Sequence, residues 1–141
     1  MPWTCAPPAI GSYVSAVAHN GFLYVSGHGP YRDGEYIYRG KVDSAVPFEE
    51  ARAATELTVL NALGSARKAL GSLDREAQVV KVLGIVNSDP DFARQPRVID
   101  GASDLLVRIF GDQGRHARSA VGMCALPMGI CAKIEMIMAF R

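Results

Sequence analysis

Hydrophobic and polar residues alternate with the period of a β-strand in the first part of the chain. Residues 13–18 and 22–26 show this alternation on either side of an Asn-Gly turn, which predicts a β-hairpin. A short third strand is expected over residues 36–42. The valine-rich run over residues 79–86 holds a single charge, which is typical of a central strand covered on both faces.

Two other stretches repeat their apolar residues at helical spacing. The first begins at Pro47, has acidic residues in its first turn and ends at Gly71, and both proline and acidic side chains favour a helix N-terminus. The second covers about residues 98–110 and ends before Gly111. Each pattern predicts a helix with one buried stripe.

The last part of the chain predicts two strands joined by a Leu-Pro turn, over residues 114–127 and 130–140. Three strands, a helix, a strand, a helix and two strands predict an α+β fold, a single sheet with both helices on one face. No repeat, low-complexity tract or interior linker interrupts the pattern, so we expect one domain over residues 1–141. A domain of this size often gains further burial by self-association.

Composition narrows the range of partners. The 15 basic and 14 acidic residues give a formal charge of +1, so we expect no nucleic-acid partner. The three cysteines are odd in number and lack paired metal-ligand spacing, which favours a reducing, cytoplasmic setting. The N-terminus lacks a signal-peptide pattern and no apolar run reaches the roughly 18 residues of a membrane span, so no membrane association is expected.

Arg118 is the first candidate for chemistry. Side chains alternate faces along a strand, so Arg118 shares a face with the small residues Ala120 and Gly122. Space beside a guanidinium suits a carboxylate, because the planar fork donates two parallel hydrogen bonds. The commoner alternative is an arginine paired with an acidic side chain, such as Glu135 on the following strand.

Lys133 and Glu135 share one face of the last strand. They line the same pocket as Arg118 if the last two strands pair, and otherwise they lie on a solvated face. A lysine gains chemistry only where burial or a neighbouring cation lowers its pKa, and a position beside Arg118 would have that effect.

The two histidines His28 and His116 suggest an acid–base pair of the kind that cleaves RNA, although they stand far apart in the sequence. His28 lies in a Gly-His-Gly-Pro sequence at the end of a predicted strand. Such a sequence either leaves backbone amides open to a ligand or, more commonly, forms a simple turn. Pro2 offers a secondary amine if Met1 is removed.

Five motifs carry a resemblance to the RidA/YjgF family of reactive-intermediate deaminases, whose members are also called endoribonuclease L-PSP. They are PAIGSYVSAV, FLYVSGHGP, VVKVLGIVNSDPDFA, VIDGASDLLVRIFG, and GRHARSAVGMCALP with the strand that follows it. The resemblance implies a homotrimer with a central barrel of sheets, helices outside, and small-molecule sites between subunits. It also implies hydrolysis of small enamine or imine carboxylates, such as 2-aminoacrylate, to a keto acid and ammonia, with no metal or organic cofactor.

Three residues match the family's site. Arg118 matches the arginine that grips the substrate carboxylate, Tyr13 matches an aromatic residue of the cleft, and Gly27 matches a glycine whose backbone touches the substrate; His28 follows it. Other positions depart from the pattern: Ala120 replaces a cysteine and Asp100 replaces an asparagine.

Lys133 replaces the glutamate that orients the attacking water, and a protonated lysine cannot accept a hydrogen bond from water. A neutral Lys133, Glu135 or backbone groups near Gly27 stay open as the group that holds the water. Positioning by Arg118 alone is a further option, because imines hydrolyse without help. The leading expectation is a deaminase acting on small carboxylates. A non-catalytic carboxylate-binding trimer is the alternative, and a ribonuclease or translation inhibitor is a weaker one.

Overall fold

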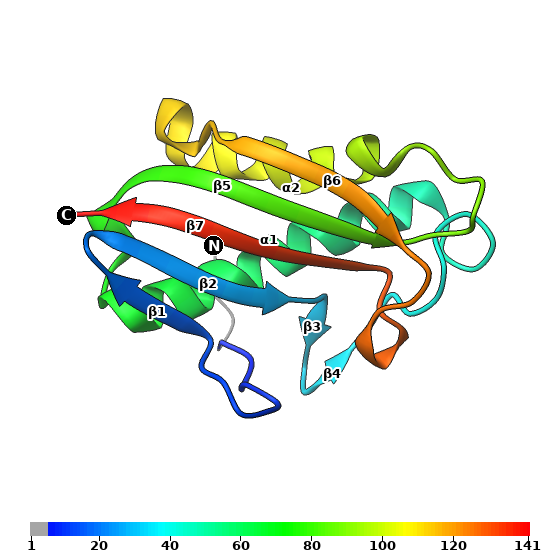
Figure 1. The fold of residues 1–141 in the computed structure, drawn as a ribbon, viewed down its shortest axis with the longest axis horizontal. Coiled ribbons are helices and arrows are strands. Elements are labelled where there is room, and N and C mark those ends of the chain that lie inside the picture. Colours follow the sequence, from blue (N-terminus) through cyan, green and yellow to red (C-terminus); the bar gives the residue numbers. More distant parts are fainter. Residues whose placement is uncertain (1–5) are drawn as a thin grey trace.

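Two long helices pack across one face of a five-stranded sheet, and Figure 1 looks onto the opposite, uncovered face. This computed structural model describes residues 6–141. The helices are α1 (Phe48–Leu70) and α2 (Gln95–Phe110). The strands of the sheet are β1 (Ala16–His19), β2 (Phe22–His28), β5 (Glu76–Asn87), β6 (Ala117–Met123) and β7 (Ala132–Phe140). The predicted α+β class, with both helices on one face, is confirmed.

The strand order is β1-β2-β7-β5-β6. Only β5 and β6 run parallel, so the sheet is mixed and mostly antiparallel, as expected. Parallel neighbours need a crossover connection, and α2 provides it. In this order β5 lies between β6 and β7, so the last two strands of the chain are not neighbours. Short 3₁₀ turns follow each long helix and precede β7 (Leu73–Arg75, Gly111–Gly114 and Pro127–Gly129).

The first hairpin is confirmed. Asn20 and Gly21 form its turn with φ angles of 51° and 81°, and positive φ at both central residues matches the right-handed twist of the paired strands. Strand pairing begins at Ala16 rather than at residue 13. Before that point the chain stays beside β2, because Ser26 bonds the backbone oxygens of Val14 and Ser15.

The prediction of a third strand over residues 36–42 was wrong. Only a two-stranded ribbon forms in this region, from β3 (Tyr31–Arg32) and β4 (Glu35–Tyr36). Tyr38 and Gly40 then have φ angles of 54° and 123°. These values lie outside the extended region, so the chain cannot continue as a strand.

The hydrophobic core lies between the sheet and the two helices. Two glycines allow close packing there. A β-carbon on Gly84 of β5 would lie 2.6 Å from Ile99 of α2, and one on Gly101 of α2 would lie 2.7 Å from the backbone oxygen of Arg52 in α1. The largest fully buried side chains include Leu23, Leu63, Ile99, Leu106, Ile134, Met136 and Met138.

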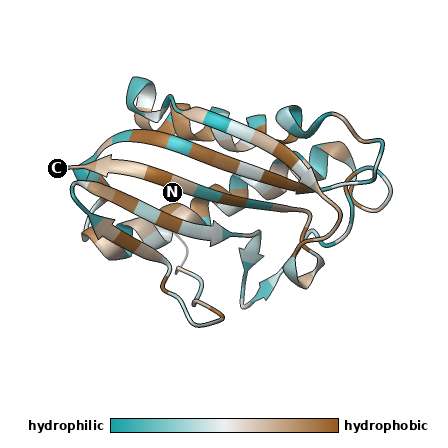
Figure 2. Ribbon diagram, viewed as in Figure 1, coloured by the Kyte–Doolittle hydropathy of each residue, from teal (hydrophilic) through white to brown (hydrophobic). Residues whose placement is uncertain are grey.

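The uncovered face of the sheet is also apolar in places. Val17, Phe22, Tyr24, Val121 and Met123 are exposed on it, and Figure 2 shows hydrophobic residues along the strands that face the viewer. An exposed apolar face of this kind is typical of an interaction surface. Within the described residues, neither long helix is apolar enough to cross a bilayer.

Glu76 is an acidic side chain buried at the start of β5. The residue is 3 % exposed, and its Oε1 atom has no hydrogen-bond partner among residues 6–141. Burial raises the pKa of Glu76 to about 7, although the nearby charge of Arg141 lowers it. The folded carboxyl therefore keeps its proton to a higher pH than the unfolded carboxyl, whose pKa is 4.5.

We predict that the free energy of unfolding falls by on the order of 3 kcal/mol as the pH rises from about 4.5 through 7, because the buried carboxyl must lose its proton. Glu76→Gln should remove this part of the pH dependence and should be more stable than the wild type above pH 7. Glu35→Gln, at an exposed position, is the control. Urea denaturation across this pH range measures the effect, and an unchanged slope in Glu76→Gln would contradict it.

Candidate functional site

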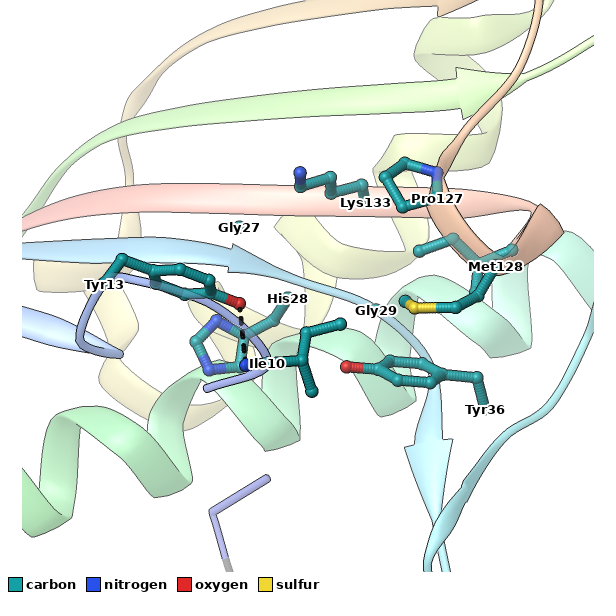
Figure 3. Close-up of a pocket in the computed structure, with 10 residues that line it drawn as sticks. Ile10, Tyr13, Gly27, His28, Gly29, Tyr36, Pro127, Met128 and Lys133 are labelled. Atoms are coloured by element: carbon teal, nitrogen blue, oxygen red, sulfur yellow. Dashed lines mark hydrogen bonds between the residues drawn. The ribbon is translucent and has the colours of Figure 1, made fainter. Parts of the chain in front are cut away.

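A cavity of about 410 Å³ lies at the end of strands β2 and β7 (Figure 3). Lys133 enters it from β7, Tyr36 from β4 and Tyr13 from the segment before β1. The Tyr13 hydroxyl accepts a hydrogen bond of 3.4 Å from the backbone N–H of Ile10. The complete lining is Ile10, Tyr13, Gly27, His28, Gly29, Tyr36, Pro127, Met128, Ile130 and Lys133.

Lys133 lies over the backbone of Gly27. A β-carbon at residue 27 would overlap the Lys133 Cε atom and lie 3.2 Å from its Nζ atom. Glycine is therefore required at residue 27 for the lysine to take this position. Lys133 makes no hydrogen bond or ion pair with any residue from 6 to 141, and the cavity lining contains no acidic side chain. The cavity thus presents an ammonium group that no residue from 6 to 141 pairs with a negative charge.

Both ring nitrogens of His28 make hydrogen bonds within the fold. Its Nδ1 donates to the Ser26 backbone oxygen at 2.6 Å, and its Nε2 accepts from the Ser65 hydroxyl of α1 at 2.8 Å. Burial lowers the pKa of His28, and the bond to Ser26 opposes this effect. The ring is therefore neutral and ties the end of β2 to α1, so neither nitrogen is free for the substrate-binding role that we expected of His28.

Arg118 lies in a separate polar network between β6 and α2. Its Nη1 atom donates to Asp100 Oδ1 at 2.7 Å and to Ser103 Oγ at 3.1 Å. Ser103 Oγ also lies 2.9 Å from His116 Nε2, and His116 Nδ1 donates to the Gly114 backbone oxygen at 2.7 Å. The bond to Gly114 fixes Nε2 as an acceptor, so the Ser103 hydroxyl donates to His116 and accepts from Arg118.

The Arg118 guanidinium keeps part of its binding capacity. Its side chain is 22 % exposed, and its Nε and Nη2 donors make no hydrogen bond to any described residue. One edge of the fork is therefore held by Asp100, and the other edge is open to an anion. The acidic partner of Arg118 is Asp100 of α2, and not Glu135 as the sequence suggested.

Strand register places Arg118 and Lys133 on opposite faces of the sheet. Val82 of β5 pairs with both Arg118 and Met136, and Val82 and Met136 are buried against the helices. Ile85 of β5 pairs with Lys133 on the uncovered face. Residues paired across strands share a face, so Arg118 lies on the helix side and Lys133 does not.

The candidate residues therefore form two groups within one chain. The cavity group contains Tyr13, Gly27, His28 and Lys133. The network group contains Asp100 and Arg118, with Ala120 beside them on the same face. Glu135 belongs to neither group, because it is exposed and does not line the cavity.

Sequence reasoning missed Ser103, Tyr36 and the role of His116. A signal existed for Ser103, which lies three residues after Asp100 on a helix, and for His116, which lies two residues before Arg118 where the chain enters β6. No pattern pointed to Tyr36, which reaches the cavity through the irregular ribbon. His116 packs beside α2 and His28 against α1, so the structure does not bring the two histidines together. Pro2 and Cys5 lie outside the described residues.

Comparison with known proteins agrees with this architecture. Residues 3–138 match the model of the family described as "YjgF/chorismate mutase-like, putative endoribonuclease". Protein TCP17 of Trypanosoma cruzi is 38 % identical over 136 residues, which cover 96 % of this chain and 84 % of TCP17. The crystal structure of Atu1372 from Agrobacterium tumefaciens, a protein of unknown function, is 39 % identical with a TM-score of 0.89, covering 91 % of this chain and 82 % of Atu1372.

A second crystal structure, of a protein from Shewanella oneidensis described as "a putative endoribonuclease", superposes with a TM-score of 0.95 at 29 % identity; the match covers 99 % of this chain and 93 % of that one. The fold thus defines a YjgF-like α+β protein. The chain belongs to the YjgF/chorismate mutase-like family, as the RidA/YjgF motifs of the sequence indicated.

Ser103→Ala tests the network around Arg118. It removes a hydroxyl that satisfies both Arg118 and His116, so we predict a loss of about 1–2 kcal/mol in the free energy of unfolding. Ser119→Ala, on the exposed face of the same strand as Arg118, should change stability by less than about 0.5 kcal/mol. Equal effects of the two variants in urea denaturation would show that the network does not stabilise the fold.

Proposed function

We propose that the protein is an enamine/imine deaminase that hydrolyses small 2-imino carboxylates to 2-keto acids and ammonia. The RidA/YjgF resemblance of the sequence implies a chemistry of this class, and the open edge of the Arg118 guanidinium supports a carboxylate substrate. The observation that carries the proposal is the separation of the candidate residues into two groups on opposite faces of one sheet.

Two groups on opposite faces can act on one substrate only if they come from different copies of the chain. Arg118 lies on β6, an edge strand of the sheet, where a second copy has access to it. The uncovered apolar face, which includes Val121 and Met123 of the same strand, offers the surface for such a contact. We propose a homotrimer, the assembly that the RidA/YjgF resemblance implies, because a heterologous contact between two different surfaces can close as a ring of this kind.

The reaction needs a carboxylate anchor and a positioned water. The Nε and Nη2 donors of Arg118 would bind the carboxylate of a 2-imino acid. Water then adds to the imine carbon, a proton moves from the adding water to nitrogen, and the carbinolamine releases ammonia as the C=O bond forms. The step consumes one water and changes no oxidation state.

The Tyr36 hydroxyl and backbone groups near Gly27 are the best candidates to hold the water. Burial raises the pKa of Tyr36, so its phenol is neutral and can both donate and accept a hydrogen bond. A protonated Lys133 only donates, and Glu135 does not line the cavity. The Tyr36 hydroxyl and the backbone near Gly27 can therefore both donate hydrogen bonds to a water and accept them from it, so no carboxylate is needed to orient the water.

A non-catalytic carboxylate-binding trimer is the second candidate. The observation that favours it is the ammonium of Lys133, which has no partner in the described part of the chain, because an ammonium binds an anion but does not activate water. Ribonuclease activity has less support. The chain is nearly neutral, and every ring nitrogen of His28 and His116 is engaged in a hydrogen bond within the fold.

Arg118→Ala should abolish catalysis. An amino-acid oxidase generates 2-imino acids in situ, and keto-acid and ammonia release are followed with and without the protein. We predict that kcat/KM falls by at least about a hundredfold, the loss of a bidentate charge-assisted contact. Arg115→Ala, an exposed arginine in the connection that leads into β6, is the matched control and should keep full activity. Equal rates with and without protein across several amino-acid precursors would refute the deaminase and leave binding to be tested by calorimetry.

Mixed trimers test the shared site. The Arg118→Ala variant lacks the arginine that the network group contributes to the proposed shared site. The Gly27→Leu variant fills the cavity and so lacks the part that the cavity group contributes. Each variant alone should be inactive. When the two are unfolded together and refolded at equal amounts, random assortment in a closed three-membered ring should restore about a quarter of wild-type activity. Activity that stays at the level of the separate variants, while both refold, would contradict a site built from two copies.

A further inference from the structure

Lys133 is the cation in the cavity that has no counter-ion among the described residues. Its stem crosses Gly27, and its Nζ has no hydrogen-bond partner among residues 6–141. The lining holds no acidic side chain and no second lysine or arginine; the other residues are two tyrosines, the internally hydrogen-bonded His28, two glycines and apolar side chains. Figure 3 shows the lysine and both tyrosines around the same space. Such a cavity favours a ligand that carries a negative charge next to an apolar body.

Arg118 is a second cation, but its charge is already offset. Asp100 lies 2.7 Å from its Nη1 atom, and that ion pair is formed within the chain. The free edge of Arg118 still supplies directional hydrogen bonds to a carboxylate. Arg118 therefore acts mainly through geometry, whereas Lys133 adds uncompensated positive charge.

A substrate with one carboxylate leaves Lys133 in an unfavourable position. With that carboxylate on Arg118, the imine end of the substrate would face the cavity that contains the ammonium. A protonated imine is itself a cation, and like charges in a partly buried site repel each other. A second carboxylate on the substrate removes this conflict, because it pairs with Lys133 and lies between the two positive groups.

We infer that Lys133 is a second anion-binding point and that the substrate is a 2-imino dicarboxylic acid, with one carboxylate on Arg118 of one copy and the other on Lys133 of the next. The joint use of both points rests on the proposed function. Lys133 is then the residue that determines specificity, and Gly27 acts through it by leaving room for its stem. The same charge should make the site prefer dicarboxylate keto acids as products.

Two keto acids of equal length separate the contribution of the second carboxylate. 2-Oxoglutarate ends in a carboxylate where 2-oxopentanoate ends in a methyl group. Calorimetry on the wild type should show that 2-oxoglutarate binds at least about tenfold more tightly, the effect of one charge-assisted hydrogen bond. Lys133→Met should remove this preference by weakening the binding of 2-oxoglutarate. Lys133→Arg keeps the charge and should retain part of the preference.

Two further variants control for fold and for net charge. Lys68→Met makes the same substitution at an exposed lysine of α1 and should bind both acids as the wild type does. Gly27→Ala keeps the ammonium but displaces it, so it should weaken 2-oxoglutarate binding more than 2-oxopentanoate binding. Equal affinity of the wild type for both acids, or a preference that survives Lys133→Met, would overturn the inference.

The same variants distinguish this inference from the deaminase proposal. If the imine of 2-oxopentanoate is hydrolysed in an Arg118-dependent manner and the two keto acids bind equally, the deaminase proposal holds and the role of Lys133 is refuted. If 2-oxoglutarate binds through Lys133 and neither imine is hydrolysed, the dicarboxylate site holds and the deaminase is refuted.

Discussion

The register of β5 determines on which face of the sheet the two candidate cations, Arg118 and Lys133, lie. This strand pairs with β6 on one side and with β7 on the other, and it aligns Val82 with Arg118 and Ile85 with Lys133. Because side chains alternate faces, this alignment sends the guanidinium toward the helices and the ammonium toward the uncovered face. A slip of one residue in either pairing would reverse one of these directions and bury a charge in the wrong layer. The buried Val82 and Met136 oppose such a slip.

The same register explains why a protein of this size has two polar centres instead of one. On the helix side, Asp100 and Ser103 both accept hydrogen bonds from the Nη1 atom of Arg118, and the Ser103 hydroxyl is also hydrogen-bonded to His116. These bonds hold Arg118 within one chain, and only the Nε and Nη2 edge of its fork is left open. The cavity around Lys133 is not satisfied within one chain. The ammonium of Lys133 has no partner among the described residues, so a ligand or another copy of the chain has to supply its counter-charge.

The sequence allowed the helices, the first hairpin and the long strands to be predicted, because each has a clear periodicity. It did not predict that β7 inserts between β2 and β5, since strand order depends on long-range pairing that a local pattern does not encode. Alternation along one strand correctly placed Arg118 and Ala120 together, but it could not compare faces between strands. The expected partner Glu135 was wrong for this reason. The third strand failed because Tyr38 adopts a left-handed conformation that its residue type does not indicate.

The charges at two substituted positions lead to one physical conclusion. The resemblance implies an asparagine and a glutamate where this chain has Asp100 and Lys133, so these positions together carry a charge of about −1 in the family pattern and about 0 here at neutral pH. Asp100 adds its negative charge where it is paired at once with Arg118, on the helix side. Lys133 adds its positive charge in the cavity, where no described residue balances it. The additional positive charge relative to the family pattern therefore lies in the cavity, where a ligand binds. A ligand with one more negative charge compensates for it.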